Sequence, residues 1–129
     1  MRIELDHVIV SARARDASAR QLAQLLDVPC GPATAGPFFA VYLNDGLTLD
    51  FIETDEDFPV EHFCFRVSEQ DFDRILVRLQ AAGIPYRGNV RGPMDNTINT
   101  DYGGRMLYWN VPEGHQWEIF TVSYARQPA

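Results

Sequence analysis

The stretch Val60-Glu61-His62-Phe63-Cys64-Phe65-Arg66-Val67 decides the fold, because two kinds of side chain alternate along it. Side chains on a strand point to opposite faces in turn. The two phenylalanines and Val67 therefore form an apolar row that packs on a helix, and His62, Cys64 and Arg66 point to the other face. The pattern predicts a strand with one buried face and one polar face, whose side chains can bind a ligand or take part in catalysis.

A similar strand opens the chain. Ile3–Val10 is short and rich in β-branched residues, which favours a strand. His7 in this strand and His62 in the later one are 55 residues apart. Asp16 and Asp71, at the starts of the helical patterns that follow the two strands, are also 55 residues apart. The order of strand and helix therefore occurs twice, which indicates an internal repeat.

Both halves end in a predicted hairpin, with an acid four residues after the turn glycine. The glycine and the acid are Gly46 and Asp50 in the first half, and Gly114 and Glu118 in the second. The residues before the two turns also match, although the spacing from tyrosine to acid differs by two residues: Tyr42-Leu43-Asn44 and Tyr108-Trp109-Asn110. The repeat therefore aligns the two tyrosines with each other and the two acids with each other.

One half, of roughly 55–65 residues, buries too little surface to be stable alone, so the two halves are expected to pair. The prediction is a single α+β domain over residues 1–129, with module one at about 1–56 and module two at about 57–124. The two tandem βαβββ modules would form a curved, mostly antiparallel sheet around a central cup, with the helices on the outer face. Asp16 and Ser68 are the expected helix caps. Tyr86–Val90 is a candidate strand, and the tail from Tyr124 is expected to be loose.

Composition excludes several classes of function. The chain has 129 residues, a formal charge of −7 and no lysine, so neither nucleic acid nor an anionic membrane surface is an expected partner. No apolar run is long enough for a membrane helix, and acids stand where a signal peptide would have its apolar core, which predicts a cytoplasmic protein. Cys30 and Cys64 are too few for a disulfide scaffold and are expected to be reduced thiols.

Strand alternation allows four side chains of the repeat to project onto one concave surface: His7, His62, Asp50 and Glu118. Two imidazoles and one carboxylate with open positions suit a divalent transition metal such as Fe²⁺, Mn²⁺, Ni²⁺ or Zn²⁺. Asp50, with its shorter side chain, is a candidate fourth ligand. A strand histidine or glutamate taken alone is more often an ordinary polar residue, and it is their equivalence in the two halves that favours a metal site.

Other residues are candidates for binding a substrate. Arg66 and Arg105 can each hold a carboxylate or a phosphate through two hydrogen bonds, and Arg66 is favoured because it shares the face of His62. Tyr42 and Tyr108 can donate to a bound oxygen or pack in the sheet. The remaining candidates are expected to have structural or lining roles: Cys64 on the polar face, His115 at the surface in a turn, and Trp109 and Trp117 in the core or an interface.

Two stretches of the chain resemble the vicinal oxygen chelate superfamily, the opening Leu5-Asp6-His7-Val8-Ile9-Val10 and the closing residues 103–119. This superfamily contains glyoxalase I, extradiol dioxygenases, methylmalonyl-CoA epimerase, fosfomycin-modifying thiol transferases and bleomycin resistance proteins. The closing motif is fairly specific to it: an aromatic strand, then Pro112-Glu113-Gly114-His115, then an acid before an aliphatic residue. The chain departs from the family at Asn110 and Glu113, where aspartate is usual. The resemblance implies tandem βαβββ modules that form a U-shaped sheet around a metal.

The resemblance also implies roles for particular residues. The family's ligand positions fall on His7, His62 and Glu118, and Asp50 stands where glyoxalase-like members have a fourth ligand. Tyr108 matches a substrate-contacting tyrosine of the fosfomycin enzymes. Small members often pair modules from different subunits, which implies a homodimer. Whether the metal site lies within one chain or across two stays open at this point.

The resemblance and the ligand set together predict a metal-dependent enzyme that acts on a small molecule with vicinal oxygens. The reaction would be a glyoxalase-type isomerisation or an extradiol-type ring cleavage, with Glu118 as the base and Tyr108 as a catalytic hydrogen-bond donor. The alternative is a non-catalytic protein of the bleomycin-resistance type, which sequesters an antibiotic or a hydrophobic ligand. Thiol transfer to an epoxide antibiotic ranks lower, because the chain has no lysine for a cation-rich pocket.

Overall fold

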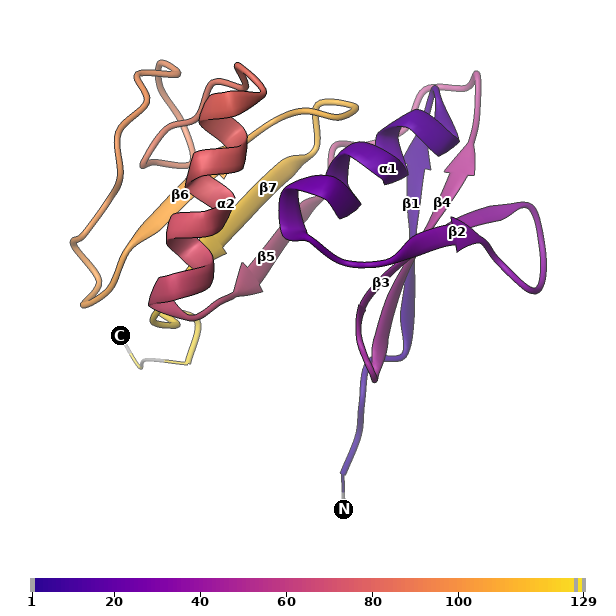
Figure 1. Ribbon diagram of the computed structural model, residues 1–129, viewed down its shortest axis with the longest axis horizontal. Helices are drawn as coiled ribbons and strands as arrows, with labels where there is room; N and C mark the ends of the chain where they lie inside the picture. Colours follow the sequence, from indigo (N-terminus) through magenta and orange to yellow (C-terminus); the bar gives the residue numbers. More distant parts are fainter. Residues whose placement is uncertain (1, 127, 129) are drawn as a thin grey trace. The chain divides into compact units, whose positions relative to one another are not determined.

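The computed structural model describes residues 2–126 and 128, and the chain divides between Pro59 and Val60 into two compact units (Figure 1). Each unit has one helix, one sheet and buried residues of its own. Met1, Gln127 and Ala129, at the ends of the predicted domain, lie outside the described residues. The organisation as one domain, with the module limits given above, stays a prediction.

The first unit contains one helix and a four-stranded sheet. Its elements are β1 (His7–Ala12), α1 (Arg15–Leu26), β2 (Cys30–Pro32), β3 (Phe38–Asn44) and β4 (Leu47–Glu53). The strand order is β1-β4-β3-β2, with β1 parallel to β4 and the other two pairs antiparallel. Alternation along β4 buries Leu49 and Phe51 against the side of the helix, and it directs Asp50 to the opposite face, as predicted.

Helix α1 begins before its predicted cap. The N-cap is Ala14, and Asp16 lies in the first turn, where its carboxylate accepts a hydrogen bond from Arg15 Nε at 2.7 Å. The prediction of Asp16 as the cap is therefore wrong, because a neighbouring guanidinium binds the carboxylate that would otherwise accept from a backbone N–H. An acid in the first turn still favours the helix through the helix dipole.

The second unit repeats this order with one strand fewer. Its elements are β5 (His62–Arg66), α2 (Glu69–Ala81), β6 (Met106–Trp109) and β7 (Gln116–Phe120), in the sheet order β5-β7-β6. Strand β5 is parallel to β7, and β6 is antiparallel to it. The strand expected at Tyr86–Val90 is reduced to an isolated bridge between Arg87 and Tyr108. The Arg87 side chain binds the carbonyls of Val90 and Gly92, and this curls the chain away from β6.

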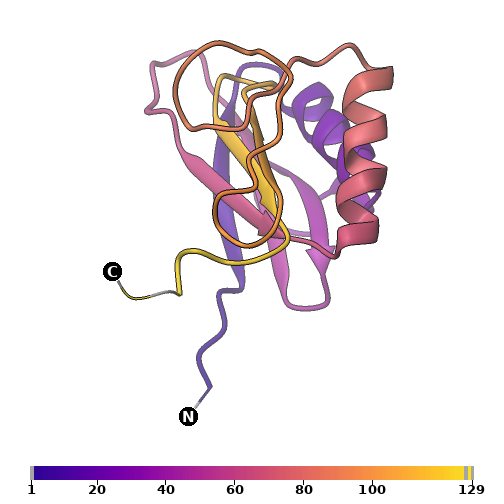
Figure 2. The ribbon, with the colours of Figure 1, turned by 90° about the vertical axis from the view of Figure 1, so that its left-hand side faces the viewer.

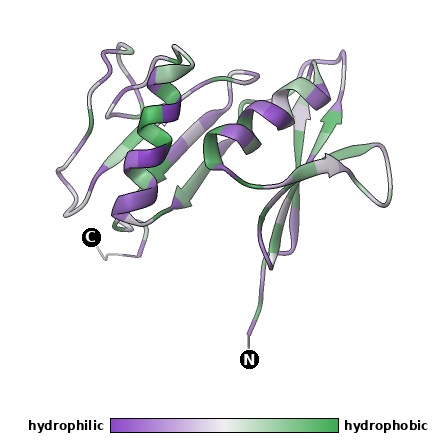
Figure 3. Cartoon of the chain, in the orientation of Figure 1, coloured by the Kyte–Doolittle hydropathy of each residue, from purple (hydrophilic) through white to green (hydrophobic). Residues whose placement is uncertain are grey.

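Helix α2 forms a second layer on one face of its own sheet (Figure 2). Ser68 Oγ accepts the backbone N–H of Asp71 at 3.0 Å, which confirms the predicted cap. Apolar and charged residues alternate along the helix (Figure 3), and Phe72, Ile75 and Leu79 are buried whereas Val77 is exposed. The buried residues of the helix and the sheet confirm that both tryptophans belong to the core: Phe72, Ile75, Leu79, Leu107, Trp109, Trp117 and Ile119.

The predicted α+β fold class is confirmed, because each unit carries one helix on a mixed sheet in the βαβββ order. In the second unit the third element of that order is the bridge at Arg87. Among the described residues, neither helix has the length and apolar character that a membrane span requires.

Candidate functional site

The polar face of the second sheet gathers residues from three strands. In the β5–β7 ladder Cys64 lies beside Glu118, and in the β6–β7 ladder Tyr108 lies beside the same residue. His62 is two residues from Cys64, so its side chain shares this face. Segments far apart in the sequence therefore direct one imidazole, one thiol, one phenol and one carboxylate to a single surface, opposite the helix.

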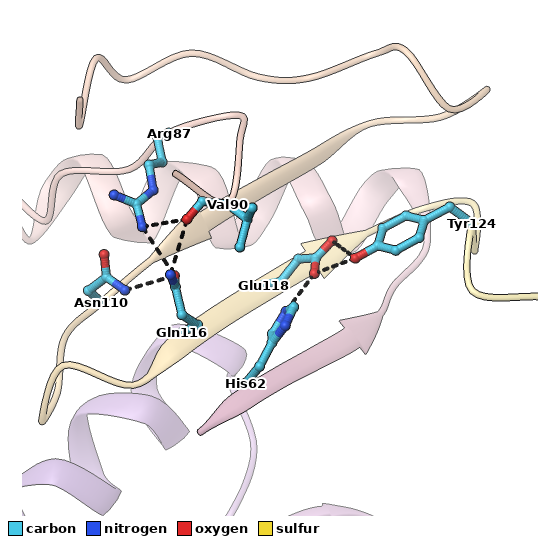
Figure 4. Close-up of polar contacts among 7 residues, drawn as sticks. All are labelled: His62, Arg87, Val90, Asn110, Gln116, Glu118 and Tyr124. Atoms are coloured by element: carbon cyan, nitrogen blue, oxygen red, sulfur yellow. Dashed lines mark hydrogen bonds and ion pairs between the residues drawn. The ribbon is translucent and has the colours of Figure 1, made fainter. Parts of the chain in front are cut away.

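Glu118 is at the centre of this surface. Its side chain is 0% exposed, and its Oε1 lies 2.9 Å from His62 Nε2. The Tyr124 hydroxyl lies 2.9 Å from Oε1 and 3.1 Å from Oε2 (Figure 4). A carboxylate removed from water is costly unless it is paired or hydrogen-bonded, and these contacts supply hydrogen bonds.

Tyr124 follows β7, in the tail that the sequence predicts to be loose. That prediction is wrong for this residue, because its ring packs against both Phe120 and Tyr102 with centroid distances of 5.4 Å. Tyr124 is also the site residue that the sequence reasoning missed. The available signal was a tyrosine only four residues after the last residue of β7, close enough for a bend to return it to the sheet.

The charge and burial of Glu118 act on its neighbours. Burial, followed by the Glu118 charge, raises the pKa of the Cys64 thiol well above its usual range. Burial is also the main cause that raises the pKa of Tyr108 and of Tyr124, and the Glu118 carboxylate adds to both. These shifts favour the protonated form of all three groups near neutral pH, so both phenols are available as hydrogen-bond donors.

A second polar network fixes the beginning of β7. Gln116 Oε1 accepts from Asn110 at 2.9 Å and from Arg87 at 3.3 Å, and Gln116 Nε2 donates to the Val90 carbonyl at 3.1 Å (Figure 4). Gln116 is the register partner of His62. The network therefore holds the strand end against which the His62 backbone is positioned.

Two cavities border the His62 and Tyr124 side chains. The larger, of about 420 Å³, also touches Cys64, Arg66 and Phe120 and extends along the C-terminal residues to Arg126. The smaller, of about 350 Å³, extends over Tyr108 toward the loop residues 88–90. Both volumes are in the range of small-molecule sites. His62 and Tyr124 line both cavities and so stand between them.

Two guanidinium groups at the larger cavity, those of Arg66 and Arg126, have no hydrogen-bond or ion-pair partner within the described part of the chain. Most other arginines are engaged, for example Arg13, Arg15 and Arg74 with carboxylates. A free guanidinium offers five N–H donors in a planar fork that suits a carboxylate or a phosphate. The structure therefore leaves positive charge at this cavity in a chain whose net charge is −7.

Arg105 lies on the helix side of the second unit. Its guanidinium binds Asp73 and Glu69 of α2, each at 2.7 Å, and its Cζ lies 4.4 Å from the ring centroid of Phe72. The contact with Asp73, followed by that with Glu69, raises the pKa of Arg105. Arg105 is thus not brought to Glu118, and its role as a substrate ligand gains no support from this geometry.

His115 is 0% exposed, so its expected place at the surface is wrong. Its Nδ1 accepts the backbone N–H of Glu61 at 3.0 Å, and its ring meets Phe63 and Trp117 edge-on. The turn before it ends at Gly114 with φ 78°, a conformation that suits glycine and folds the imidazole back under the sheet. His115 is a core residue that ties this turn to the start of β5.

The first sheet carries a matching polar face. The β1–β4 register pairs His7 with Thr48 and Ile9 with Asp50, so His7 and Asp50 share one face. His7 Nδ1 contacts Asp6 Oδ2 at 2.8 Å. This contact, followed by the charge of Asp50, raises the pKa of His7. Asp50 is half-buried, and its side chain has no hydrogen-bond partner among the residues described.

The two aligned tyrosines are not structural equivalents. Tyr108 pairs with Glu118, whereas Ala40 pairs with Asp50 and Tyr42 pairs with Thr48. The alignment of Tyr42 with Tyr108 is therefore wrong by two residues, because the second hairpin has the longer turn. Tyr42 lies on the polar face of the first sheet, and its contact with a substrate stays a prediction.

The predicted metal ligands fall into two sets, one in each unit: His62 and Glu118 in the second, His7 and Asp50 in the first. Across the described residues, no three His, Cys, Asp or Glu side chains are grouped around one point. The pair in the second unit fits a divalent ion, because two bonds of about 2.1 Å at right angles place the donor atoms about 3.0 Å apart. His62 Nε2 and Glu118 Oε1 are 2.9 Å apart.

No protein-family model and no curated protein matches the chain. Among solved structures it is similar to a protein described as "Oxidase ChaP-H2", with 38% identity over 97% of this chain and 98% of that one, and a TM-score of 0.88. "Oxidase ChaP-H1" matches with 38% identity over 96% and 99% of the two chains and a TM-score of 0.86. A lactoylglutathione lyase from Agrobacterium tumefaciens shares the fold, with 15% identity, coverage of 91% and 92%, and a TM-score of 0.68.

Proposed function

This chain belongs to the vicinal oxygen chelate superfamily, and from that premise we propose that it is a metal-dependent oxidative enzyme. The proposed substrate is a small molecule with two neighbouring oxygens, and the proposed oxidant is dioxygen. The two structures described as oxidases share 38% of their residues with it over nearly the whole chain, against 15% for the lyase. Identity at the higher level favours oxidative chemistry over glyoxalase-type isomerisation, and extradiol-type ring cleavage is the oxidative reaction that we propose.

The observation that carries the proposal is the contact of His62 Nε2 with the fully buried Glu118 at 2.9 Å. An imidazole nitrogen and a carboxylate oxygen are both common ligands of divalent transition metals. We propose that these two groups hold the ion together with His7, and that Asp50 is a candidate fourth ligand. When bound, such an ion supplies Lewis-acid stabilisation of an enolate or alkoxide and, if it is iron, one-electron chemistry with dioxygen.

The protein's own groups would prepare the substrate for cleavage. Glu118 is the proposed proton acceptor for a substrate hydroxyl, and Tyr108, beside it in the sheet, is the proposed donor to a substrate oxygen. An extradiol cleavage breaks one ring C–C bond beside the two oxygens and places both atoms of dioxygen in the product. Phe120 and Met106 give the two cavities apolar walls that limit the access of water.

Arg66 is the proposed anchor for an acidic group on the substrate, with Arg126 beside it. Both guanidinium groups line the larger cavity, and both lack a partner within the described residues. A carboxylate on an aromatic diol would offer the planar pair of acceptors that a guanidinium fork fits. The proposed substrate class is therefore an acidic aromatic diol.

The third ligand raises the question of a homodimer. Small members of the superfamily are expected to pair modules from different subunits, so we propose that His7 reaches the site from either its own chain or a second copy. Mixing the His7→Ala and His62→Ala proteins separates these cases. In a shared site, the mixed dimer regains metal because one of its two sites is intact, whereas a site within one chain regains none.

Metal analysis of the purified full-length protein tests the proposed function. We expect about one equivalent of iron or a similar divalent metal, lost in His62→Ala and retained in Glu56→Gln, a control at an exposed acid. With metal restored, dioxygen uptake is measured with 3,4-dihydroxybenzoate and with catechol as probes. A folded protein that binds no divalent metal overturns the proposal and supports the sequestering, bleomycin-resistance type instead.

A further inference from the structure

We infer that Tyr124 is a positioning residue that restricts Glu118 to one metal-binding oxygen, an inference that rests on the proposed function above. The Tyr124 hydroxyl lies 2.9 Å from Oε1 and 3.1 Å from Oε2 of Glu118. Its single proton is therefore shared between the two oxygens of a carboxylate that has no access to water.

The two carboxylate oxygens differ in their other contacts. Oε1 faces His62 Nε2 at 2.9 Å, whereas Oε2 lies 3.1 Å from the Tyr124 hydroxyl, and Cys64 and Tyr108 also hydrogen-bond the carboxylate. Oε1 therefore lies where it can share an ion with His62. A hydrogen bond that also occupies Oε2 opposes binding through both oxygens. Glu118 then takes one position on the metal instead of two, which leaves more positions for a chelating substrate.

The hydroxyl is held in place independently of Glu118. The Tyr124 ring is edge-on to Phe120 and tilted against Tyr102, with both pairs of centroids 5.4 Å apart. The same ring lines both cavities around His62. A donor fixed by packing keeps its position when a metal or substrate binds. Such a donor can therefore hold the Glu118 carboxylate in one orientation as a metal ligand.

A purely structural role would give a different result. If Tyr124 served only to satisfy a buried carboxylate, removing its hydroxyl would lower the free energy of unfolding and leave the affinity for metal unchanged. If it positions Glu118, the affinity for metal falls even where the protein remains folded. Loss of a residue that hydrogen-bonds a metal ligand, without itself binding the metal, typically weakens metal binding by about 10–100-fold.

Tyr124→Phe removes the hydroxyl and keeps the ring, and Tyr102→Phe is the matched control. Tyr102 packs on the same ring, is 52% exposed, and makes no hydrogen bond through its hydroxyl in the described residues. The dissociation constant for Mn²⁺ is measured by competition with a chelator, with thermal unfolding as the check of folding. We expect an increase of about 10–100-fold for Tyr124→Phe and less than about 3-fold for Tyr102→Phe.

A second variant tests the hydrogen bond itself. Tyr124→Gln keeps an N–H donor without the ring, and we expect it to bind Mn²⁺ more tightly than Tyr124→Phe. Wild-type affinity in Tyr124→Phe overturns this inference alone, provided that the wild type binds Mn²⁺ and His62→Ala does not. A wild-type protein that binds no Mn²⁺, Fe²⁺ or Zn²⁺ overturns the proposed function and this inference together.

Discussion

Asp50 and Glu118 occupy the same register position in two separate sheets. Asp50 pairs with Ile9, two residues after His7, and Glu118 pairs with Cys64, two residues after His62. Their surroundings differ, because Glu118 is fully buried and held by His62 and Tyr124, whereas Asp50 is half-buried without a hydrogen bond in the part of the chain described. The repeat supplies two carboxylates, and the structure orients one of them.

This difference predicts unequal contributions to metal binding. Glu118→Gln is expected to weaken metal binding by more than about 100-fold, because it removes a ligand that neighbouring groups orient. Asp50→Asn is expected to weaken it by less than about 10-fold, because no hydrogen bond within the described residues orients that carboxylate. Isothermal titration with Zn²⁺ or Mn²⁺ measures both. Equal losses in the two variants would establish Asp50 as a full ligand and contradict the prediction.

The guanidinium of Arg66, which has no partner among the residues that the structure describes, predicts a preference for acidic ligands. Arg66→Ala is expected to raise the KM for 3,4-dihydroxybenzoate about 10–100-fold, with kcat little changed, because hydrogen bonds to charged groups contribute about 1.5–3 kcal/mol. Activity with catechol, which lacks the carboxylate, is expected to change little. Arg91→Ala, at an exposed loop arginine outside both cavities, is the control. A similar rise in KM with both substrates would show that Arg66 does not bind the substrate carboxylate.

The burial of His115 predicts a large effect on stability. His115→Ala leaves a cavity between Phe63 and Trp117 and removes the acceptor for the Glu61 N–H, so we expect a loss of about 2–4 kcal/mol in the free energy of unfolding. His7→Ala, at an exposed histidine, is expected to change stability by less than about 0.5 kcal/mol. Urea unfolding compares the two, and similar midpoints would rule out a core role for His115.

The carboxylate of Glu69 predicts a dependence of stability on pH. A hydrogen bond from Thr121, followed by that from Arg105, lowers its pKa in the folded state below the ordinary value of about 4.3. The folded state therefore binds a proton less readily than the unfolded state, so this contribution is present above the ordinary value and is lost as the pH falls through the lowered one.

Glu69→Gln is expected to unfold at a lower temperature than the wild type at pH 7, with the gap closing as the pH falls below the ordinary pKa value. Glu56→Gln, whose side chain makes no hydrogen bond within the described residues, is expected to show no such closing gap. Thermal unfolding across this pH range checks both variants. A gap in unfolding temperature that stays constant for Glu69→Gln would mean that the stabilising contact between Arg105 and Glu69 does not depend on the charge of this carboxylate.

Particular residues show where reading from the sequence succeeded. The strand at His62 was predictable because alternation needs only a local pattern, and the cap at Ser68 was predictable because its partner is three residues away. The face shared by His62 and Glu118 also followed from alternation. The strand predicted at Tyr86–Val90 is absent from the described structure except for a single bridge at Arg87, because side-chain hydrogen bonds of Arg87 override the local preference there.

What the sequence determined by itself is the repeat, the strand and helix order, and the face on which each polar residue lies, because these depend on periods of two and 3.6 residues. Only the tertiary structure decided that the tail returns Tyr124 to Glu118, that His115 is buried, and that the Arg105 side chain binds carboxylates of helix α2. Each of these depends on contacts between residues that no periodic pattern relates. A tail or a turn has no period, so its place is set by the surfaces it can bury and the donors and acceptors it can satisfy.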